Sequence, residues 1–424
     1  MAKVYLEAYG CSSSFADFEI ACGLLKQAGF ELARNEKESE LNVIFTCVVK
    51  QQTFNKMLHK LKELIKLKKP LIVAGCMAKT DSKLIEKINP KASLIAPENV
   101  ERIVDAANAA LRGERVVLIQ DSKKPKLGLP RCRRNPFVAI VQIARGCTSN
   151  CSYCYEPYRS KLLSYPLEGI VEEVKKALAD GCREIWLTSL DCGCYGFDIG
   201  TNLAELLIEI CKLEGKFFVR VGMANPLHAK KILNKLIEAY QDEKVFKFLH
   251  LPLQSGSDKV LKLMKRGYKA KDFVEIVKKF RKAFPKLTLS TDIIAGFPSE
   301  TEKDFLATKK ILEKVKPDVV NLSKFGARPR TEAAKMKQLN AKTISERSLE
   351  LSKLIKKISF EKNKLWIGWK GEALVDEIGK KGSFVARNFA YKPIVLKTRE
   401  EIFGKFVEVE VEEARENFLF GKKI

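Results

Sequence analysis

In the segment Val138-Ala-Ile-Val-Gln-Ile-Ala144-Arg-Gly-Cys147-Thr-Ser-Asn-Cys151-Ser-Tyr-Cys154, an apolar run leads directly into three closely spaced cysteines. The run predicts a buried β-strand, so the thiols would lie on a tight loop at its carboxyl end. Cysteine thiolates hold [4Fe–4S] clusters, which take four ligands. Three thiolates on one loop would fix such a cluster and leave one iron open to bind and activate a small molecule.

Two alternative interpretations of this loop are a zinc site that lacks one ligand and three unconnected thiols. Structural zinc usually takes four ligands, and the three histidines of the chain, His59, His228 and His250, lie far from the loop in the sequence. Disulfides are also unexpected among the twelve cysteines, because the cytoplasm is reducing. We therefore predict an iron–sulfur cluster on the three loop cysteines.

The region around the loop alternates strands with helices. Each strand candidate is followed by a helical pattern, and the candidates are 137–144, 183–189, 217–222, 247–253, 287–294 and 318–324. Six βα units are too few to close the eight-stranded barrel, so we expect a partial, open (βα)6 barrel. The cysteine loop would then lie at the carboxyl end of a barrel strand, where such barrels hold their active sites.

Three further cysteines follow predicted strands near the start of the chain. Cys11 follows the strand 4–9, and Cys47 and Cys76 follow the next two strands. The carboxyl ends of parallel strands share one edge of a sheet, so these thiols should converge although 29–36 residues separate them. One such cysteine is usually a small buried residue. Three in succession predict a second cluster, on a Rossmann-like parallel sheet.

The rest of the chain divides by composition. Residues 121–136 are rich in proline and basic side chains, which predicts a linker. The last part has short alternating strands separated by glycines, which is typical of a small antiparallel barrel, a shape often used to hold RNA. We therefore expect an α/β protein with a parallel-sheet domain over 1–120, the partial barrel over 133–362 and the small barrel over 363–424.

The charge of the chain points to a polyanionic partner. Seventy-seven basic and fifty-two acidic residues give a formal charge of +25, and nucleic acid is the commonest intracellular polyanion. A lysine-rich solvated surface is the alternative. No apolar run approaches the roughly 18–20 residues of a membrane helix, and the first residues lack the pattern of a signal peptide. We expect a cytoplasmic location and no membrane contact.

Together these features resemble one family, the methylthiotransferases of the radical S-adenosylmethionine (SAM) superfamily, over essentially the whole chain. The C-terminal segment looks like the TRAM domain with which these enzymes grip RNA. The motifs that carry the resemblance, besides the cysteine loop, are Tyr9-Gly10-Cys11, Thr46-Cys47-Val48-Val49-Lys50, Gly75-Cys76-Met77-Ala78, Leu187-Thr188-Ser189, Val221-Gly222-Met223, Pro252-Leu-Gln254-Ser255-Gly256-Ser257, Thr291-Asp292-Ile293-Ile294 and Gly296-Phe297-Pro298.

The resemblance implies two [4Fe–4S] clusters and SAM as cofactors. The open iron of the loop cluster would chelate the amino and carboxylate groups of SAM, and electron transfer would cleave SAM to a 5′-deoxyadenosyl radical. Tyr153, inside the loop, would pack against the adenine of SAM, and a merely structural aromatic is the alternative. The other SAM contacts that the resemblance implies are Ser189, Asp191, Gln254 and Ser255.

The activity that the resemblance implies is attachment of a methylthio group to C2 of a modified adenosine at position 37 of tRNA. One SAM would methylate sulfur associated with the N-terminal cluster, and a second would supply the radical that removes the C2 hydrogen. An aromatic C–H has no useful acidity, so no histidine or paired-carboxylate site is needed. The expected partners are the tRNA anticodon stem-loop, a flavodoxin- or ferredoxin-like electron donor and a sulfur source.

Three segments resemble the archaeal and eukaryotic branch, which acts on N6-threonylcarbamoyladenosine: 161–166, 195–201 and 388–393. The hydrophobic C-terminal anchor of the eukaryotic members is missing after Phe420, which favours the archaeal type. The alternatives are the isopentenyladenosine enzyme, the ribosomal-protein enzyme, a cobalamin-dependent radical SAM enzyme, and an iron–sulfur RNA-binding paralogue without full activity.

Several residues depart from the family pattern beside the proposed ligands or SAM contacts. Asparagine is expected at two of these positions, glycine at three and a polar residue at one, and Cys192 and Cys194 replace threonine and alanine. The two cysteines are most simply tolerated small residues, with a thiol close to the substrate as the alternative. The changes would affect fine positioning and with it activity or target; the other positions are Ser14, Phe45, Ser160, Ser299, Arg330 and Leu190.

Overall fold

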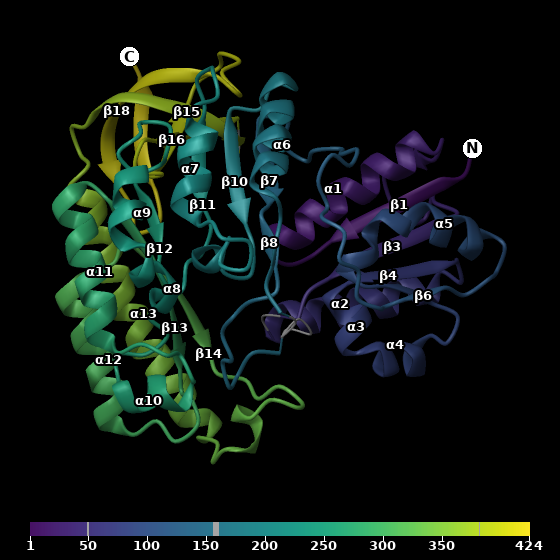
Figure 1. Ribbon diagram of the computed structural model, residues 1–424, viewed down its shortest axis with the longest axis horizontal. Helices are drawn as coiled ribbons and strands as arrows, with labels where there is room; N and C mark the ends of the chain where they lie inside the picture. The colour runs from purple at the N-terminus through teal and green to yellow at the C-terminus, as the bar shows by residue number, and fades with distance from the viewer. Residues whose placement is uncertain (49–50, 156–160, 381) are drawn as a thin grey trace.

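The computed structural model describes residues 1–48, 51–155, 161–380 and 382–424. Three units follow one another along the chain: a parallel sheet with its helices, a second alternation of strands and helices, and a small barrel (Figure 1). This confirms the predicted α/β architecture. Within the described ranges, none of the helices combines the length and apolar character that crossing a bilayer requires.

The N-terminal unit is a six-stranded, entirely parallel sheet in the order β2-β1-β3-β4-β5-β6. The two central strands are completely buried, as expected for a parallel sheet that helices cover on both faces. Its strands are β1 (Lys3–Ala8), β2 (Glu31–Leu32), β3 (Leu41–Thr46), β4 (Leu71–Gly75), β5 (Ser93–Ile95) and β6 (Val117–Leu118), and its helices are α1 (Ser12–Gln27), α2 (Gln51–Lys66), α3 (Cys76–Thr80), α4 (Ser82–Ile88), η1 (Pro97–Arg102) and α5 (Ile103–Leu111).

The central unit contains the six predicted parallel strands in two three-stranded sheets, β11-β10-β7 and β12-β13-β14. A parallel bridge between Val219 of β11 and Val245, just before β12, links the two sheets. Strands β7 and β14 remain as outer strands, so the barrel is open. The strands are β7 (Val138–Gln142), β10 (Glu184–Thr188), β11 (Phe218–Val221), β12 (Phe248–His250), β13 (Thr288–Ala295) and β14 (Val319–Lys324), with a small ribbon of β8 (Ala144–Arg145) and β9 (Leu163–Ser164).

Helices cover the outside of this barrel, and a long helix leads out of it. The amphipathic segment predicted over 343–362 is α13 (Ala341–Lys364). The remaining helices are α6 (Leu167–Ala179), η2 (Cys192–Cys194), α7 (Leu203–Cys211), α8 (Pro226–Lys231), α9 (Leu233–Ala239), α10 (Asp258–Leu263), α11 (Ala270–Ala283), α12 (Glu302–Val315) and η3 (Ala333–Lys335).

The C-terminal unit is a closed barrel in the order β15-β16-β17-β19-β18. The predicted small barrel is confirmed: four of its neighbouring strand pairs are antiparallel, and β17 pairs with β19 in parallel. Five strands cannot alternate in direction around a closed ring, so one neighbouring pair must be parallel. The strands are β15 (Lys370–Ile378), β16 (Ser383–Asn388), β17 (Pro393–Lys397), β18 (Phe406–Ala414) and β19 (Leu419–Lys423).

The small barrel packs against the amino-terminal ends of the central strands. Phe137, just before β7, contacts Phe403 with ring centroids 4.8 Å apart. Asp318, just before β14, pairs with Lys392 at 2.9 Å, and both side chains are buried. The cysteine loop instead follows the carboxyl-terminal end of the first central strand. The small barrel and the loop therefore lie at opposite ends of the central unit.

The predicted linker is packed along the first helix of the chain. Lys126 is buried against Asp17 of α1, and the backbone N–H of Cys132 donates to the carbonyl of Glu19 at 2.9 Å. Arg131 bonds Glu173 of α6 at 2.8 Å. The segment thus ties the N-terminal sheet to the central unit, although its composition alone suggested a simple connection.

Candidate functional site

Cys11, Cys47 and Cys76 converge at one edge of the N-terminal sheet. Strands β1, β3 and β4 are neighbours and all end there, and Thr46 pairs with Gly75, so Cys47 and Cys76 follow their strands at the same level. A hydrogen bond between the thiols of Cys11 and Cys47 lowers the pKa of Cys11 to about 6. The strand pattern predicted this convergence, while the role of the three thiols as cluster ligands stays a prediction.

Two glycines make the close approach of these cysteines feasible. Gly10 has a φ of 128°, and a Cβ atom there would lie 2.5 Å from the Cβ of Cys47. Gly75 has a φ of 90°, and a Cβ atom there would lie 2.4 Å from the carbonyl oxygen of Thr46. Any side chain at these positions would push the strand ends apart.

The two departures beside these cysteines differ in their consequences. The hydroxyl of Ser14 lies 4.0 Å from the sulfur of Cys11, so a polar group is retained there. Phe45 is 1% exposed and packs edge-on against Phe18, with ring centroids 5.9 Å apart. It therefore adds to the core of the sheet and offers no polar group to the cysteines.

Hydrogen-bond donors contact the sulfurs of the cysteine loop. The backbone N–H of Ser149 lies 3.3 Å from Cys147 Sγ, and Nη1 of the buried Arg266 lies 3.1 Å from Cys151 Sγ. Such donors favour thiolates and are the kind of contact that tunes a bound metal centre. The loop therefore fits an iron–sulfur cluster. Arg266 was not singled out from the sequence, because it is 115 residues from Cys151.

Behind Cys147 lies a buried group of polar side chains. The carboxylate of Asp191 accepts from Nδ1 of His228 at 2.6 Å and from the backbone N–H groups of Gly193 and Asn225 at 2.9 and 3.0 Å. Its Oδ2 also lies 3.9 Å from Cys147 Sγ. His228, 3% exposed, is thus a partner of the loop rather than a metal ligand.

The thiol of Cys194 also contacts the loop. The neighbouring thiol of Cys194 lowers the pKa of Cys147 to about 6. Cys194 is completely buried, and its thiol donates to the backbone carbonyl of Asp191 at 3.2 Å. Across the described ranges, the one group of ligand atoms close enough to share a single metal ion is Cys147, Asp191 and Cys194, all within 4.8 Å of one another. One departure from the family pattern thus places a fourth thiol against a proposed cluster ligand.

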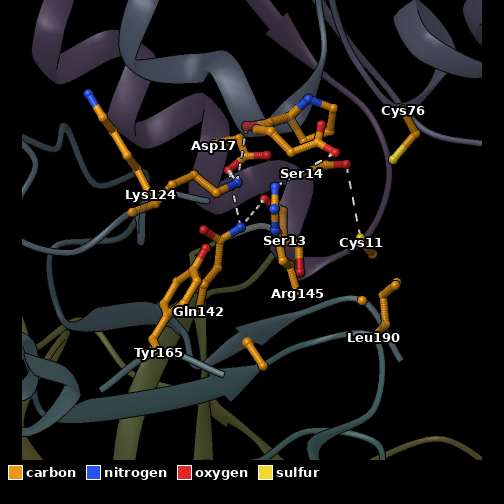
Figure 2. Close-up of a pocket in the computed structure, with 15 residues that line it drawn as sticks. Cys11, Ser13, Ser14, Asp17, Cys76, Lys124, Gln142, Arg145, Tyr165 and Leu190 are labelled. Carbon is orange, nitrogen blue, oxygen red and sulfur yellow. Dashed lines mark hydrogen bonds and ion pairs between the residues drawn. The ribbon is translucent and has the colours of Figure 1, made fainter. Parts of the chain in front are cut away.

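A small cavity of about 70 Å³ lies between the N-terminal cysteines and the cysteine loop. Cys11 and Cys76 line it from the sheet, and Gly146 and Leu190 line it from the central unit (Figure 2). Leu190 stands where a polar residue is usual, so it makes this wall apolar. The cavity therefore reaches from Cys11 and Cys76 to Gly146, the residue before Cys147.

Charged and amide groups form the far wall of the small cavity. Asp17, which pairs with Lys126, also accepts from Nε2 of Gln142 at 3.1 Å (Figure 2). Glu98 pairs with Lys79 at 2.8 Å. These residues come from the N-terminal unit, the packed linker and β7, so the wall exists because the linker lies along α1.

A larger cavity of about 420 Å³ opens beside the loop, inside the central barrel. Tyr153 and Cys154 line it from the loop, and Gln254 lines it from the segment after β12. Asp292 of β13 accepts from Nδ2 of Asn321 at 2.8 Å on another wall. Small-molecule sites usually have volumes of about 300–1,000 Å³, so this cavity is large enough for a ligand.

Two of the predicted SAM contacts share the larger cavity. Tyr153 packs edge-on against Phe297, with ring centroids 6.2 Å apart, and Gln254 has a left-handed φ of 66°. The cavity lies directly against the cysteine loop, as a SAM site requires.

The other three predicted SAM contacts have protein partners. The hydroxyl of Ser189 lies 3.5 Å from Cys192 Sγ. The carboxylate of Asp191 accepts the hydrogen bonds from His228, Gly193 and Asn225 described above. Ser255 is completely buried, with its hydroxyl 3.3 Å from that of Thr308. The SAM-binding role of all five residues stays a prediction.

The remaining departures concern glycine positions. Ser299 and Arg330 have φ values of 64° and 65°, the left-handed conformation that glycine adopts most readily. This explains why glycine is usual there. The side chain of Arg330 donates to the carbonyl of Thr80 at the N-terminal unit. Ser160, Val49 and Lys50 lie outside the described residues.

Three family descriptions match the chain. The Radical SAM superfamily matches residues 141–312, which hold the cysteine loop. The Uncharacterized protein family UPF0004 matches residues 3–96, which hold the N-terminal cysteines. The TRAM domain matches residues 367–424, which form the small barrel.

Relatives from archaea and animals match over the full chain. A protein of Pyrococcus abyssi named probable threonylcarbamoyladenosine tRNA methylthiotransferase is 43% identical over 100% of the chain and 99% of its own length. A Methanothermobacter thermautotrophicus protein of the same name is 38% identical over 99% of each. The human threonylcarbamoyladenosine tRNA methylthiotransferase is 33% identical over 100% of the chain and 74% of its own length.

Solved structures show a similar fold at low sequence identity. The radical SAM methyltransferase TsrM from Kitasatospora setae, with cobalamin and a [4Fe–4S] cluster bound, has a TM-score of 0.57 at 16% identity, covering 79% of this chain and 77% of its own. The cobalamin-dependent radical SAM enzyme OxsB has a TM-score of 0.53 at 12% identity, covering 84% of this chain and 56% of its own. These likenesses concern the fold alone.

Proposed function

Because the chain belongs to the threonylcarbamoyladenosine tRNA methylthiotransferase family of radical SAM enzymes, we propose that it converts N6-threonylcarbamoyladenosine at position 37 of tRNA to its 2-methylthio derivative. The observation that carries the proposal is a small cavity that reaches from Cys11 and Cys76 of the N-terminal set to Gly146, the residue directly before the cysteine loop. A sulfur-inserting enzyme needs a sulfur site and a radical site within reach of one substrate, and this arrangement supports both.

The proposed cofactors are two [4Fe–4S] clusters and SAM. Cys147, Cys151 and Cys154 would hold one cluster, and the N-terminal cysteines would hold the other. With SAM bound, the loop cluster supplies a radical able to remove hydrogen from an unactivated C–H bond. The protein's part is to hold the loop in position, through the hydrogen bonds from Arg266 and Ser149.

The two cavities suit different parts of the reaction. The cavity of about 70 Å³ beside Cys11 and Cys76 has room for a small sulfur species. The cavity of about 420 Å³ beside the loop has the volume of an ordinary ligand site. We assign SAM and the target nucleoside to the larger cavity and sulfur to the smaller one.

The proposed partners are the tRNA anticodon stem-loop, a flavodoxin- or ferredoxin-like electron donor and a sulfur source, with the reaction taking place in the cytoplasm. The TRAM domain match and the charge of +25 support an RNA substrate. Because the TRAM barrel lies at the end of the central unit opposite to the loop, the tRNA would have to contact both ends of the barrel.

The test is mass spectrometry of tRNA nucleosides from cells with and without the gene. Loss of 2-methylthio-N6-threonylcarbamoyladenosine, with accumulation of its precursor, is the expected result. Anaerobic reconstitution should give about eight irons per chain for two [4Fe–4S] clusters. An unchanged nucleoside profile, or one cluster per chain, would contradict the proposal.

A further inference from the structure

Arg328 is a buried cation beside the cysteine loop. It is 8% exposed and lines the larger cavity together with Cys154 and Lys324. Its guanidinium lies over the rings of Phe54 and Tyr155, at 5.4 and 5.8 Å from their centroids. These contacts orient the side chain without neutralising its charge.

No carboxylate among the described residues lies within ion-pair distance of the Arg328 guanidinium; Asp81, which accepts from the Tyr155 hydroxyl at 3.0 Å, acts on it only from further away. The Nη2 atom of Arg328 is buried and has no hydrogen-bond partner among the described residues. Arg347 by contrast bonds Glu300 at 2.7 Å, and Arg131 bonds Glu173 at 2.8 Å. An arginine cannot give up its proton, and a buried charge is costly unless it is paired. Arg328 is therefore suited to an anion that arrives with a ligand.

The backbone fixes Arg328 relative to the loop. The N–H and the hydroxyl of Thr331 both donate to the carbonyl of Arg328, at 3.2 and 2.8 Å. Two residues further on, the N–H of Ala333 donates to the carbonyl of Ser152 inside the cysteine loop at 3.0 Å. The position of the guanidinium is thus tied to the place where the chemistry would occur.

The larger cavity is electrically asymmetric. On one wall Asp292 lies with Asn321 and His250, whose Nε2 is 3.1 Å from its carboxylate. That wall suits hydrogen-bond donors and repels anions. Arg328 lies toward the N-terminal unit, with its guanidinium over Phe54 of α2, so an anionic group in this cavity is directed to it.

We propose that Arg328 binds an oxyanion of the substrate nucleotide. This inference rests on the proposed function, whose substrate carries two kinds of oxyanion: the carboxylate of the threonylcarbamoyl group and the backbone phosphates. Arginine recognises both through the same paired N–H donors. In this role Arg328 orients the nucleotide, so that its adenine faces the cysteine loop.

The experiment measures RNA binding to the anaerobically reconstituted full chain, with and without the Arg328→Gln substitution. Three anticodon stem-loops differ at position 37: adenosine, N6-threonylcarbamoyladenosine, and the methyl ester of the latter, in which the carboxylate is masked. The matched control is Arg112→Gln, which removes one positive charge from an exposed arginine that pairs with Glu114. SAM binding is measured in parallel.

If Arg328 binds the carboxylate, Arg328→Gln weakens binding of the threonylcarbamoyl RNA by about tenfold, as for a lost charged hydrogen bond. Binding of the other two RNAs then stays at the level of the control. If it binds a phosphate, all three RNAs lose affinity alike and more than with Arg112→Gln. Affinities equal to those of the control, or weakened SAM binding with unchanged RNA binding, would overturn the proposal.

Arg328→Lys covers the case in which the glutamine variant loses its clusters. Lysine keeps the positive charge but lacks the two parallel N–H donors of the guanidinium. This variant should therefore bind the affected RNA several-fold more weakly than the wild type. Wild-type affinities with intact clusters would again overturn the assignment. If the wild-type enzyme binds none of the three RNAs, the proposed function fails and the assignment fails with it. If the wild-type enzyme binds the RNAs and the Arg328 variants bind them equally well, the assignment alone fails.

Discussion

The Nδ1 atom of His228 lies 2.6 Å from the Oδ2 atom of Asp191, in a pair that is almost completely buried. The other ring nitrogen of His228 lies 2.8 Å from the hydroxyl of Thr148, which follows Cys147 in the loop. The imidazole therefore connects the loop to the carboxylate that lies beside the sulfur of Cys147. This connection is structural support for a proposed cluster ligand.

We predict that Asp191→Asn and His228→Ala each weaken the loop cluster. Removing a partner of a metal ligand typically lowers metal affinity or activity about 10–100-fold. The measurement is iron retained per chain after exposure to a chelator, together with the spectrum of the reduced cluster. His59→Ala is the control, because His59 is exposed and pairs with Glu63 on the helix surface. Equal iron retention in all three variants would contradict the prediction.

We further predict that Cys194→Ala lowers the reduction potential of the loop cluster. A hydrogen bond to a cluster sulfur raises the potential, and the thiol of Cys194, whose sulfur lies within 4.8 Å of that of Cys147, is placed to donate one when a cluster is bound. A bond of about 0.5–1.5 kcal/mol corresponds to a change of about 20–60 mV for one electron. A redox titration followed by electron paramagnetic resonance measures it.

Cys194→Ser and Cys192→Ala are the comparisons for that experiment. Serine keeps a donor at position 194 and should retain part of the potential. Cys192 hydrogen-bonds Ser189 and the carbonyl of Leu187, so its substitution should leave the potential unchanged. A shift in Cys192→Ala equal to that in Cys194→Ala would mean that packing, and not the hydrogen bond, is responsible.

Local patterns predicted the elements, and long-range contacts supplied what the patterns missed. The strands before Cys11, Cys47 and Cys76 are visible as apolar runs, and the parallel N-terminal sheet brings their ends to one edge whatever the loops do. Arg266 and His228 reach the cysteine loop from 115 and 80 residues away. Nothing in their own neighbourhoods marks them, because their role depends on how separate βα units pack.

Ser299 and Arg330, at positions where glycine is usual, have left-handed φ values that should lower the thermal stability of the protein. A non-glycine residue in the left-handed conformation costs of order 1 kcal/mol, so Ser299→Gly should raise Tm by about 1–2 °C. Arg330→Gly should raise Tm by less, because it also removes the hydrogen bond from Arg330 to the carbonyl of Thr80. Differential scanning fluorimetry of the two variants checks this. A larger gain for Arg330→Gly than for Ser299→Gly would contradict it.

A buried carboxyl group between the central unit and the small barrel gives a pH dependence. Burial, together with the neighbouring Asp376, raises the pKa of Glu184 to about 8. The folded protein thus holds a proton on Glu184 that the unfolded chain releases near pH 4.5. The stability from this proton is complete below that pH and is lost as the pH rises toward 8.

Glu184→Gln should therefore flatten the fall of Tm between pH 5 and pH 8. The amide keeps a donor for Asp376 and cannot ionise, so the change in slope is at most about 1.4 kcal/mol per pH unit. Thermal scans of the wild type and the variant across this range measure it. Glu214→Gln, at an exposed position, is the control and should follow the wild-type curve. A wild-type Tm that rises across this range relative to that of Glu184→Gln would contradict the prediction, because it would show that Glu184 is ionised in the folded state. Arg387, which pairs with Asp376, would then be the counter-ion.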